Sequence, residues 1–171
     1  VDRSRGLGDV YKRQTEQVEL ELKEFFPKMR VARLDYDTTR AKNKFKNIIN
    51  SFDNHEYDVL VGTQMITKGL DFKNVQLVGV LNLDSSMNFP DFRSYERSFQ
   101  LIQQVSGRAG RSKEQGEVLI QTYNSKSTTV NQIITGDYEM FYNEQVHDRE
   151  KFNYPPFVKL IKITIKHKEL N

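Results

Sequence analysis

Cysteine is absent from all 171 residues of this chain. Without thiols the chain can form neither disulfide bonds nor a cysteine-ligated zinc cluster. The three histidines, His55, His147 and His167, are scattered along the sequence and suggest no metal site. We therefore expect no disulfide framework and no metal ligands within this chain.

Long hydrophobic runs are absent as well. No stretch reaches the roughly 18 apolar residues of a membrane-spanning helix, and the first residues lack the apolar core of a secretory signal. We therefore expect a cytoplasmic protein that does not span a membrane. The net charge of +3 is mild, so it permits a polyanionic partner but does not require one.

A phosphate-binding loop is the third absence. The chain contains no Gly-x-x-x-x-Gly-Lys-Ser/Thr motif, and none of its apolar strand candidates ends in an adjacent pair of acids suited to Mg²⁺. Phosphoryl transfer needs a cradle for the β-phosphate and the metal as well as cations for the γ-phosphate. The chain therefore cannot by itself hold a nucleotide for hydrolysis, and any such role requires a second domain.

Helical and strand patterns alternate along the sequence. Strands are predicted at 30–34, 57–61, 75–83 and 118–123, and helices at 15–26, 40–52, 91–111 and 128–152, the last with a possible interruption at Gly136-Asp137. This alternation predicts an α/β domain over residues 15–152 with a doubly wound, mostly parallel sheet. Ligands of such sheets gather at the carboxyl ends of the strands.

The two ends of the chain are expected to differ from this domain. Residues 1–14 show no sustained apolar period, which predicts an unstructured arm or an artefactual junction, with a basic nucleic-acid-binding arm as the alternative. Apolar residues alternate with lysines from Val158 to His167 and predict a strand. We assign residues 153–171 to the truncated start of a further, C-terminal domain.

The segment Gln104-Val-Ser-Gly-Arg-Ala-Gly-Arg111 has the most informative pattern. On a helix at about 100° per residue, Gln104, Arg108 and Arg111 lie on one stripe. Guanidinium groups suit phosphates because they remain charged and donate two parallel hydrogen bonds. The alternative is an amphipathic helix with a solvated basic face. Upstream, the stripe continues with Arg93, Arg97 and Gln100, and the opposite face carries Phe92, Tyr95, Phe99, Ile102, Val105 and Ala109.

Polar loops follow two of the predicted strands. The loop Gly62-Thr63-Gln64 offers backbone amides and a hydroxyl, which bind phosphate oxygens without reading a base. Lys68, Gly69 and Asp71 then add a cation, a flexible position and a carboxylate that can accept a hydrogen bond from a ribose hydroxyl. Asp84-Ser-Ser-Met-Asn88 follows the next strand. The alternative is ordinary turn chemistry at the ends of strands.

Residues 62–72 resemble motif V of superfamily 2 helicases, and residues 104–111 resemble motif VI. Further blocks are similar to those of the PriA (primosomal protein N′) family of bacterial replication-restart helicases. These blocks are Thr15–Val18, Asp35–Thr39, Val78–Asp84, Pro90–Arg93, Glu96-Arg97, Phe99–Leu101, Gly116–Val118, Ile120–Thr122 and Tyr154–Phe157. Two departures are small, since Lys73 stands where the family usually has proline and Ser106 where alanine is common.

This resemblance implies the second RecA-like motor lobe of an ATP-dependent 3′-to-5′ DNA helicase of the primosome, which acts in replication-fork restart. ATP and Mg²⁺ would be held mainly by the first motor lobe of the same protein, and zinc by a cysteine-rich segment upstream. The isolated chain would then be inactive. The implied partners are single-stranded and forked DNA, the first motor lobe and other primosome proteins.

The resemblance also implies roles for individual residues. Arg111 would be the principal arginine finger, with Arg108 as its partner and Gln104 orienting water or a phosphate oxygen. Nucleotide binding would involve Gly69 and Asp71, and DNA binding Thr63, Gln64 and Lys68. Two alternatives remain open: another superfamily 2 DNA translocase, and a non-catalytic DNA-binding adaptor that keeps the motor fold.

Overall fold

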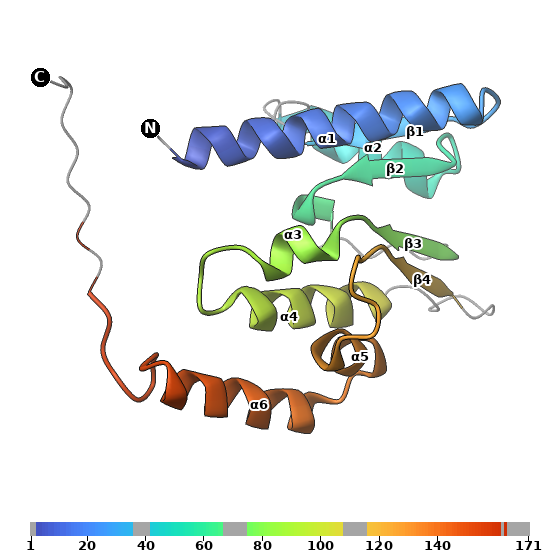
Figure 1. The fold of residues 1–171 in the computed structure, drawn as a ribbon. Coiled ribbons are helices and arrows are strands. Elements are labelled where there is room, and N and C mark those ends of the chain that lie inside the picture. Colours follow the sequence, from blue (N-terminus) through green and yellow to red (C-terminus); the bar gives the residue numbers. More distant parts are fainter. Residues whose placement is uncertain (1–2, 36–41, 67–74, 108–115, 162, 164–171) are drawn as a thin grey trace, which may run out of the picture. The chain divides into compact units, whose positions relative to one another are not determined.

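The computed structural model describes residues 3–35, 42–66, 75–107, 116–161 and 163. The chain divides into two compact units (Figure 1), one formed by residues 1–78 with 104–118 and the other by residues 79–103 with 119–171. The predicted site residues Lys68, Gly69, Asp71, Arg108 and Arg111 lie outside the described residues.

The first unit is built on a parallel strand pair. Strand β1 (Val31–Leu34) pairs with β2 (Val59–Gly62) in a register that sets Val31 opposite Val59 and Leu34 opposite Gly62. Both strands lie within the predicted ranges, apart from Gly62 at the end of β2. Parallel strands need a crossover connection, and helix α2 (Lys42–Asp53) lies between them in the sequence. The predicted order of strand, helix and strand is thus confirmed.

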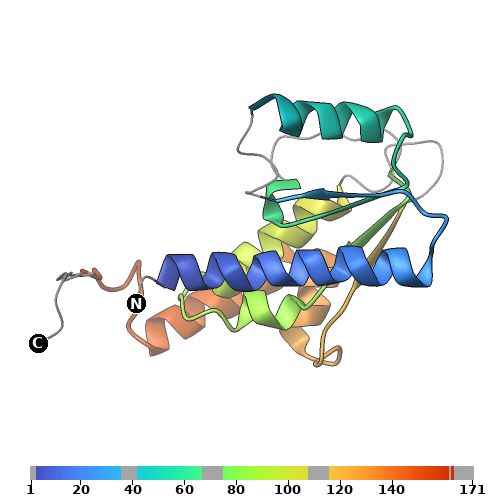
Figure 2. The same ribbon diagram turned by 90° about the horizontal axis from the view of Figure 1, so that it is seen from above.

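Two helices cover this strand pair on opposite sides. Figure 2 shows α1 (Arg3–Phe25) on one side and α2 on the other. Burial on both sides explains why β1 reads as a nearly continuous apolar run, with Val31, Ala32 and Leu34 buried. The Arg33 side chain of β1 reaches α1, where its Nη1 lies 2.8 Å from Glu16 Oε1 and its Nε 3.4 Å from Glu19 Oε2.

Helix α1 differs from the sequence-based expectation at both of its ends. It begins at Arg3, so the prediction of an unstructured arm over residues 1–14 is wrong for residues 3–14. Once a helix has formed, each added residue gains a hydrogen bond, so it can extend through a stretch without apolar periodicity. At the other end the helix stops before Pro27, as predicted. Phe25 and Phe26, assigned to its inward face, are exposed, whereas Val18 and Leu22 are half-buried.

Strands β3 (Leu77–Val80) and β4 (Glu117–Ile120) form a second two-stranded sheet. The amide of Glu117 donates to Gln76 O at 2.7 Å and the amide of Gln121 to Val80 O at 2.8 Å. These bonds advance in the same direction along both strands, as in a parallel pair. The α/β class is therefore confirmed, while a single doubly wound sheet stays a prediction.

The second unit has a helical core. It contains α3 (Leu83–Met87), α5 (Thr128–Thr135), α6 (Tyr138–Lys151) and α4 (Ser94–Ser106) as far as Gln103. The core cluster consists of Leu83, Met87, Phe99, Ile102, Val130, Ile133 and Phe141. Phe99 stacks on Phe141 with ring centroids 4.5 Å apart and meets Tyr138 edge-on at 5.9 Å. Phe99 and Ile102 thus occupy the buried face of α4, as its apolar pattern predicts.

Helix α3 is absent from the sequence-based prediction, which extends the strand to Leu83. The strand instead ends at Val80, and Asn82 adopts a left-handed conformation with φ of 53°. Its side chain accepts a hydrogen bond from the Ser85 amide at 3.1 Å and caps α3. Asparagine tolerates this backbone region better than most residues, so a short helix begins inside an apolar run.

Two expectations for the C-terminal part have different outcomes. The possible interruption at Gly136-Asp137 is confirmed, since Gly136 ends α5 with φ of 71° and Asp137 caps α6 by accepting a hydrogen bond from the Met140 amide.

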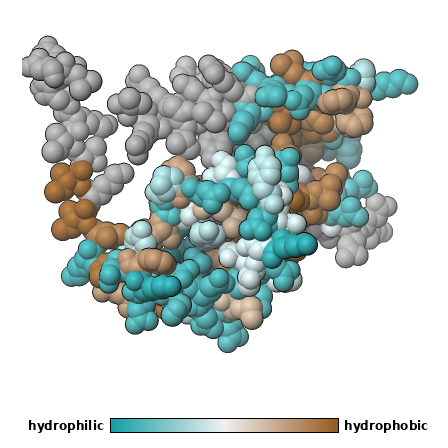
Figure 3. Space-filling view, viewed as in Figure 1, coloured by the Kyte–Doolittle hydropathy of each residue, from teal (hydrophilic) through white to brown (hydrophobic). Residues whose placement is uncertain are grey.

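The prediction of a strand at 158–167 is wrong for its described residues 158–161 and 163, which are in no strand. This segment carries hydrophobic surface (Figure 3), with Ile161 87% and Ile163 81% exposed. An alternating pattern needs a neighbouring strand to form a ladder, and no described strand pairs with this segment.

Candidate functional site

The loop that leaves β2 carries two of the predicted DNA-binding residues. Gly62 ends the strand, Thr63 is half-buried, and Gln64 is exposed at the start of a short 3₁₀ helix, η1 (Gln64–Ile66). The amide of Ile66 donates to Thr63 O at 3.0 Å and closes the turn. Thr63 and Gln64 therefore lie together at the carboxyl end of a parallel strand, where such sheets bind ligands.

Gly62 fixes the direction in which this loop leaves the sheet. A Cβ atom on Gly62 would collide with the Leu34 carbonyl oxygen and with the Ile66 side chain. A backbone oxygen cannot move as a flexible side chain can, so this position needs glycine for a close backbone approach. The end of β1 thereby sets the position of Thr63 and Gln64.

Helix α4 presents Gln104 to solvent. Gln104 is exposed one residue before the buried Val105, so the predicted division into a polar and an apolar face holds up to the end of α4 at Ser106. The placement of Arg108 and Arg111 on the same stripe stays a prediction, because both lie outside the described residues.

The upstream arginines of this stripe have partners within the chain. Arg97 Nη2 lies 3.1 Å from Asp91 Oδ2, and the Arg93 guanidinium lies 5.3 Å from the centre of the Phe92 ring. Asp91, predicted as the helix cap, precedes α4 by three residues and accepts a hydrogen bond from the Arg93 amide at 2.9 Å. A structural role explains these two arginines, and we exclude them from the candidate site.

The polar cluster that begins at Asp84 is also structural. One carboxylate oxygen of Asp84 accepts from the Thr122 hydroxyl at 3.0 Å, and the other accepts from the Tyr123 amide at 2.9 Å. The amide of Asn82 donates to Gln121 Oε1 at 3.1 Å. These bonds connect the start of α3 to the segment after β4, and both carboxylate oxygens of Asp84 are hydrogen-bonded within the chain.

A second cluster joins three of the quoted family blocks. Arg149 Nη2 donates to Glu96 Oε2 at 2.8 Å, and its guanidinium lies 5.2 Å from the centre of the Phe92 ring. Phe92 stacks on Tyr154 with centroids 5.4 Å apart, and Arg149 Nη1 donates to Pro155 O at 3.4 Å. Arg149 therefore contacts all three blocks, Pro90–Arg93, Glu96-Arg97 and Tyr154–Phe157. Sequence reasoning missed Arg149, since its partner Glu96 is 53 residues away.

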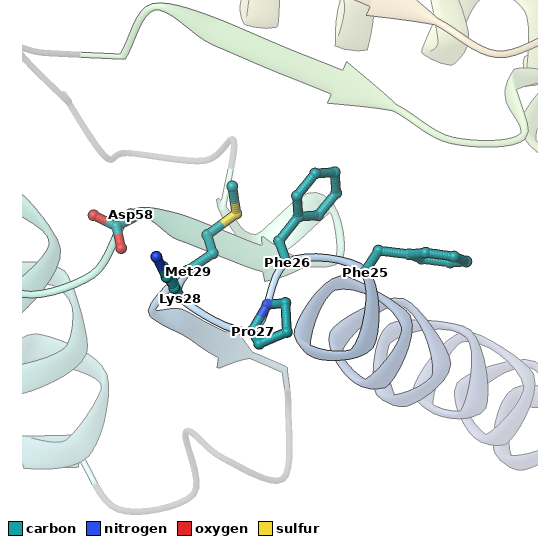
Figure 4. A pocket seen from close by; sticks show the side chains of 6 residues that line it. All are labelled: Phe25, Phe26, Pro27, Lys28, Met29 and Asp58. Carbon is teal, nitrogen blue, oxygen red and sulfur yellow. The ribbon is translucent and has the colours of Figure 1, made fainter.

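A hollow of about 560 Å³ lies at the opposite end of the first strand pair. Figure 4 shows the side chains that line it: Phe25, Phe26, Pro27, Lys28, Met29 and Asp58. Met29 precedes β1 and Asp58 precedes β2, so the hollow lies at the amino ends of both strands. The predicted site lies at their carboxyl ends, and this hollow is therefore no part of it.

An ion pair joins these amino ends. Arg30 Nη2 lies 2.7 Å from Asp58 Oδ1, Arg30 Nε donates to Asp58 Oδ2 at 3.0 Å, and the Arg30 amide donates to the same oxygen at 2.8 Å. The side-chain bonds from Arg30, followed by its amide, lower the pKa of Asp58 from 3.8 to about 2. The side-chain bonds to Asp58 raise the pKa of Arg30.

We expect the Asp58 carboxylate to titrate near pH 2 in a carbon-13 NMR experiment. Since the folded-state pKa is the lower one, the ion pair contributes stability above about pH 4, and this contribution is lost as the pH falls toward 2. Replacing Arg30 with glutamine should return the Asp58 titration toward 3.8. Replacing the nearby Lys28 with glutamine is the control and should leave it low. An unchanged titration in Arg30→Gln would contradict the assigned cause.

The described residues contain neither a metal-binding cluster nor a membrane-spanning helix. No group of three or more histidine, aspartate or glutamate side chains there is placed to hold a metal ion. Within the same ranges, no helix combines the length and the apolar character needed to cross a bilayer.

The chain is similar to curated replication restart proteins. It is 46% identical over 156 residues to the "Replication restart protein PriA" of Bacillus subtilis, which covers 91% of this chain and 19% of that protein. For the PriA protein of Synechocystis the identity is 47% over 147 residues, covering 86% of this chain and 18% of the relative. For that of Thermotoga maritima it is 39% over 154 residues, covering 90% and 21%.

The chain therefore spans about a fifth of the length of these relatives. A family model described as "Helicase conserved C-terminal domain" matches residues 9–113. This range contains the helicase-like segments 62–72 and 104–111 as well as the strand pair β1–β2. It begins six residues before Thr15, the predicted start of the domain. With more than half of its residues matched, the chain belongs to the helicase conserved C-terminal domain family.

Proposed function

We propose that this chain is the C-terminal motor lobe of an ATP-dependent 3′-to-5′ DNA helicase that acts in replication-fork restart. The observation that carries the proposal is the family match over residues 9–113, which includes both the segment after β2 and the arginine segment after α4. The similarity to replication restart proteins of several bacteria supports the more specific role.

The proposed chemistry takes place in a composite site. Arg111 and Arg108 bring positive charge to the γ-phosphate of an ATP molecule held on another lobe, and Gln104 orients water or a phosphate oxygen. An arginine finger stabilises the charge that develops in the transition state. The exposed position of Gln104 at the end of α4 is compatible with this role, because the arginine segment follows it directly.

Nucleotide and DNA would meet different parts of the sequence segment that follows β2. Thr63, Gln64 and Lys68 bind phosphates of single-stranded DNA, and Gly69 and Asp71 approach the ribose of ATP. The position of Thr63 and Gln64 at the carboxyl end of β2 supports the first assignment. The first lobe of the same protein holds most of the ATP and the Mg²⁺.

We further propose that the complete lobe has the RecA-like, doubly wound sheet predicted from the sequence. The parallel β1–β2 pair, covered by helices on both sides, supports this topology. From the family match and the similarity to replication restart proteins, we also propose that the protein works in the cytoplasm on single-stranded and forked DNA, together with other primosome proteins. Another superfamily 2 translocase and a non-catalytic DNA-binding adaptor are the competing functions.

Reconstitution from separate lobes tests this proposal. Neither this chain nor the ATP-binding lobe of the same protein should hydrolyse ATP alone, whereas their mixture should show DNA-stimulated hydrolysis. A matched mixture in which this chain carries Lys46→Ala, an exposed change on α2, should behave like the wild type. DNA binding by the mixture without any turnover would identify an adaptor, and hydrolysis by this chain alone would contradict the composite site.

A further inference from the structure

The last turn of α4 is bonded to the C-terminal end of α5 through Gln103. Gln103 Nε2 donates a hydrogen bond of 3.0 Å to the carbonyl oxygen of Ile133. Gln103 is half-buried, and Ile133 is fully buried beside it in the core of the second unit. The two residues are 30 positions apart in the sequence. Gln103 immediately precedes Gln104, the predicted catalytic residue.

The Ile133 carbonyl oxygen needs a hydrogen-bond donor because it lies at the end of α5. The last carbonyls of a helix have no regular donor within the helix. The amide of Asp137, four residues after Ile133, donates instead to Gln132 O at 3.1 Å, and the Gly136 amide also donates to Gln132 O. Gln103 therefore supplies a donor to a buried carbonyl at which the helical ladder has ended.

Gly136 leaves the space that this bond requires. It has a φ of 71°, and a Cβ atom built on it would lie 3.2 Å from Gln103 Oε1 and 3.3 Å from Gln103 Nε2. These distances are shorter than most real Cβ contacts, so a side chain at this position would press on the Gln103 amide. The Gln103 donor, the Ile133 acceptor and the space at Gly136 together form a specific contact between α4 and α5, called here the fitted contact.

The apolar contacts near Gln103 fix the position of α4 along its axis less sharply than this hydrogen bond does. Phe99 and Ile102 pack against the core mainly by shape, and apolar packing is non-directional. A hydrogen bond is directional and weakens steeply when its angle or length changes. Gln103 thus holds the last turn of α4 in register with α5.

From this geometry we propose that Gln103 is a positioning residue for Gln104, the next residue of α4. The proposal rests on the proposed function, because its effect on turnover requires that Gln104 act at the nucleotide. Gln103 makes no contact with substrate in this role. It sets the axial position of the last turn of α4, which carries Gln104.

Replacing Gln103 with leucine in the full-length protein is expected to lower kcat for DNA-stimulated ATP hydrolysis about tenfold, since misplacement of a reacting group by about 1 Å can cost up to about a hundredfold. KM for ATP and the affinity for DNA should stay near wild-type values. Gln103→Lys should retain most of the turnover, because an ammonium group can donate to a carbonyl at a helix C-terminus. Gln145→Leu, the same change at a half-buried glutamine on α6, is the control.

A second pair of variants keeps the test informative if Gln103→Leu is poorly stable. Gly136→Asn places a residue that tolerates positive φ at this position, and its Cβ should displace the Gln103 amide and lower kcat. The effects of Gly136→Asn and Gln103→Leu should not add in the double variant, because both remove one contact. Wild-type kcat in Gln103→Leu, an equal loss in Gln103→Lys, or additive effects would overturn the positioning role. Failure of the proposed function is recognised separately, by unchanged turnover in Arg111→Ala.

Discussion

Replacing Arg111 with alanine in the full-length protein is expected to lower the rate of ATP hydrolysis by at least about a thousandfold. In its proposed role the guanidinium group would neutralise charge that develops on the γ-phosphate, and alanine would remove both this charge and the two parallel hydrogen bonds. Binding of single-stranded DNA should change little, because the proposed DNA contacts lie in the loop after β2. Steady-state hydrolysis and fluorescence anisotropy with labelled DNA measure the two effects.

Two further variants separate the role of Arg111 from a general effect of charge. Arg111→Lys keeps a positive charge but loses the planar fork, so we expect a large loss of turnover here as well. Lys46→Ala removes an exposed cation from α2 and should leave turnover unchanged. Turnover at the wild-type level in Arg111→Ala would remove the finger role and favour the adaptor function.

The largest effect on stability is expected from Phe99→Ala, which should lower the free energy of unfolding by about 3–5 kcal/mol. Phe99 is 6% exposed and packs between Phe141, at 4.5 Å, and Tyr138, at 5.9 Å. Alanine would leave a cavity in the core of the second unit. Urea unfolding, followed by circular dichroism, measures the change.

Phe25→Ala is the matched control for this experiment. The apolar pattern of α1 predicts Phe25 on the inward face, but its side chain is 72% exposed. Removing it should change the free energy of unfolding by less than about 0.5 kcal/mol. A loss comparable to that of Phe99→Ala would show that Phe25 is buried, as the sequence pattern predicts, and would contradict this position of the α1 end.

The sequence predicts those parts of the fold that depend on local chemistry. Periodicity locates α2, the strand pair β1–β2 and the buried face of α4, and Gly136 marks the break between α5 and α6 because it adopts a positive φ there. Sequence-based prediction fails where contacts between residues far apart in the sequence determine the secondary structure. Helix α3 depends on the left-handed Asn82 and on the Asp84 bonds to Thr122 and Tyr123, which are 38 and 39 residues away.

The candidate site divides in a similar way. Its residue types and their order follow from the sequence, and the structure adds positions for Thr63, Gln64 and Gln104. The sequence could not show that Arg93 and Arg97 already have partners, because helical periodicity places them on the same stripe as Gln104. The fitted contact of Gln103 with α5 was equally hidden, since Ile133 belongs to a distant helix.

Three carboxylates surround the single guanidinium of Arg33. Glu16 and Glu19 approach from α1, and Asp35, which is buried, lies 3.2 Å from Arg33 Nε just after β1. Lys23 Nζ lies 2.7 Å from the other oxygen of Glu19, so three carboxylates share two cations and the group keeps one excess negative charge. In the proposed function, this excess charge would disfavour a DNA backbone near the end of β1, most strongly at low ionic strength, where screening is weak.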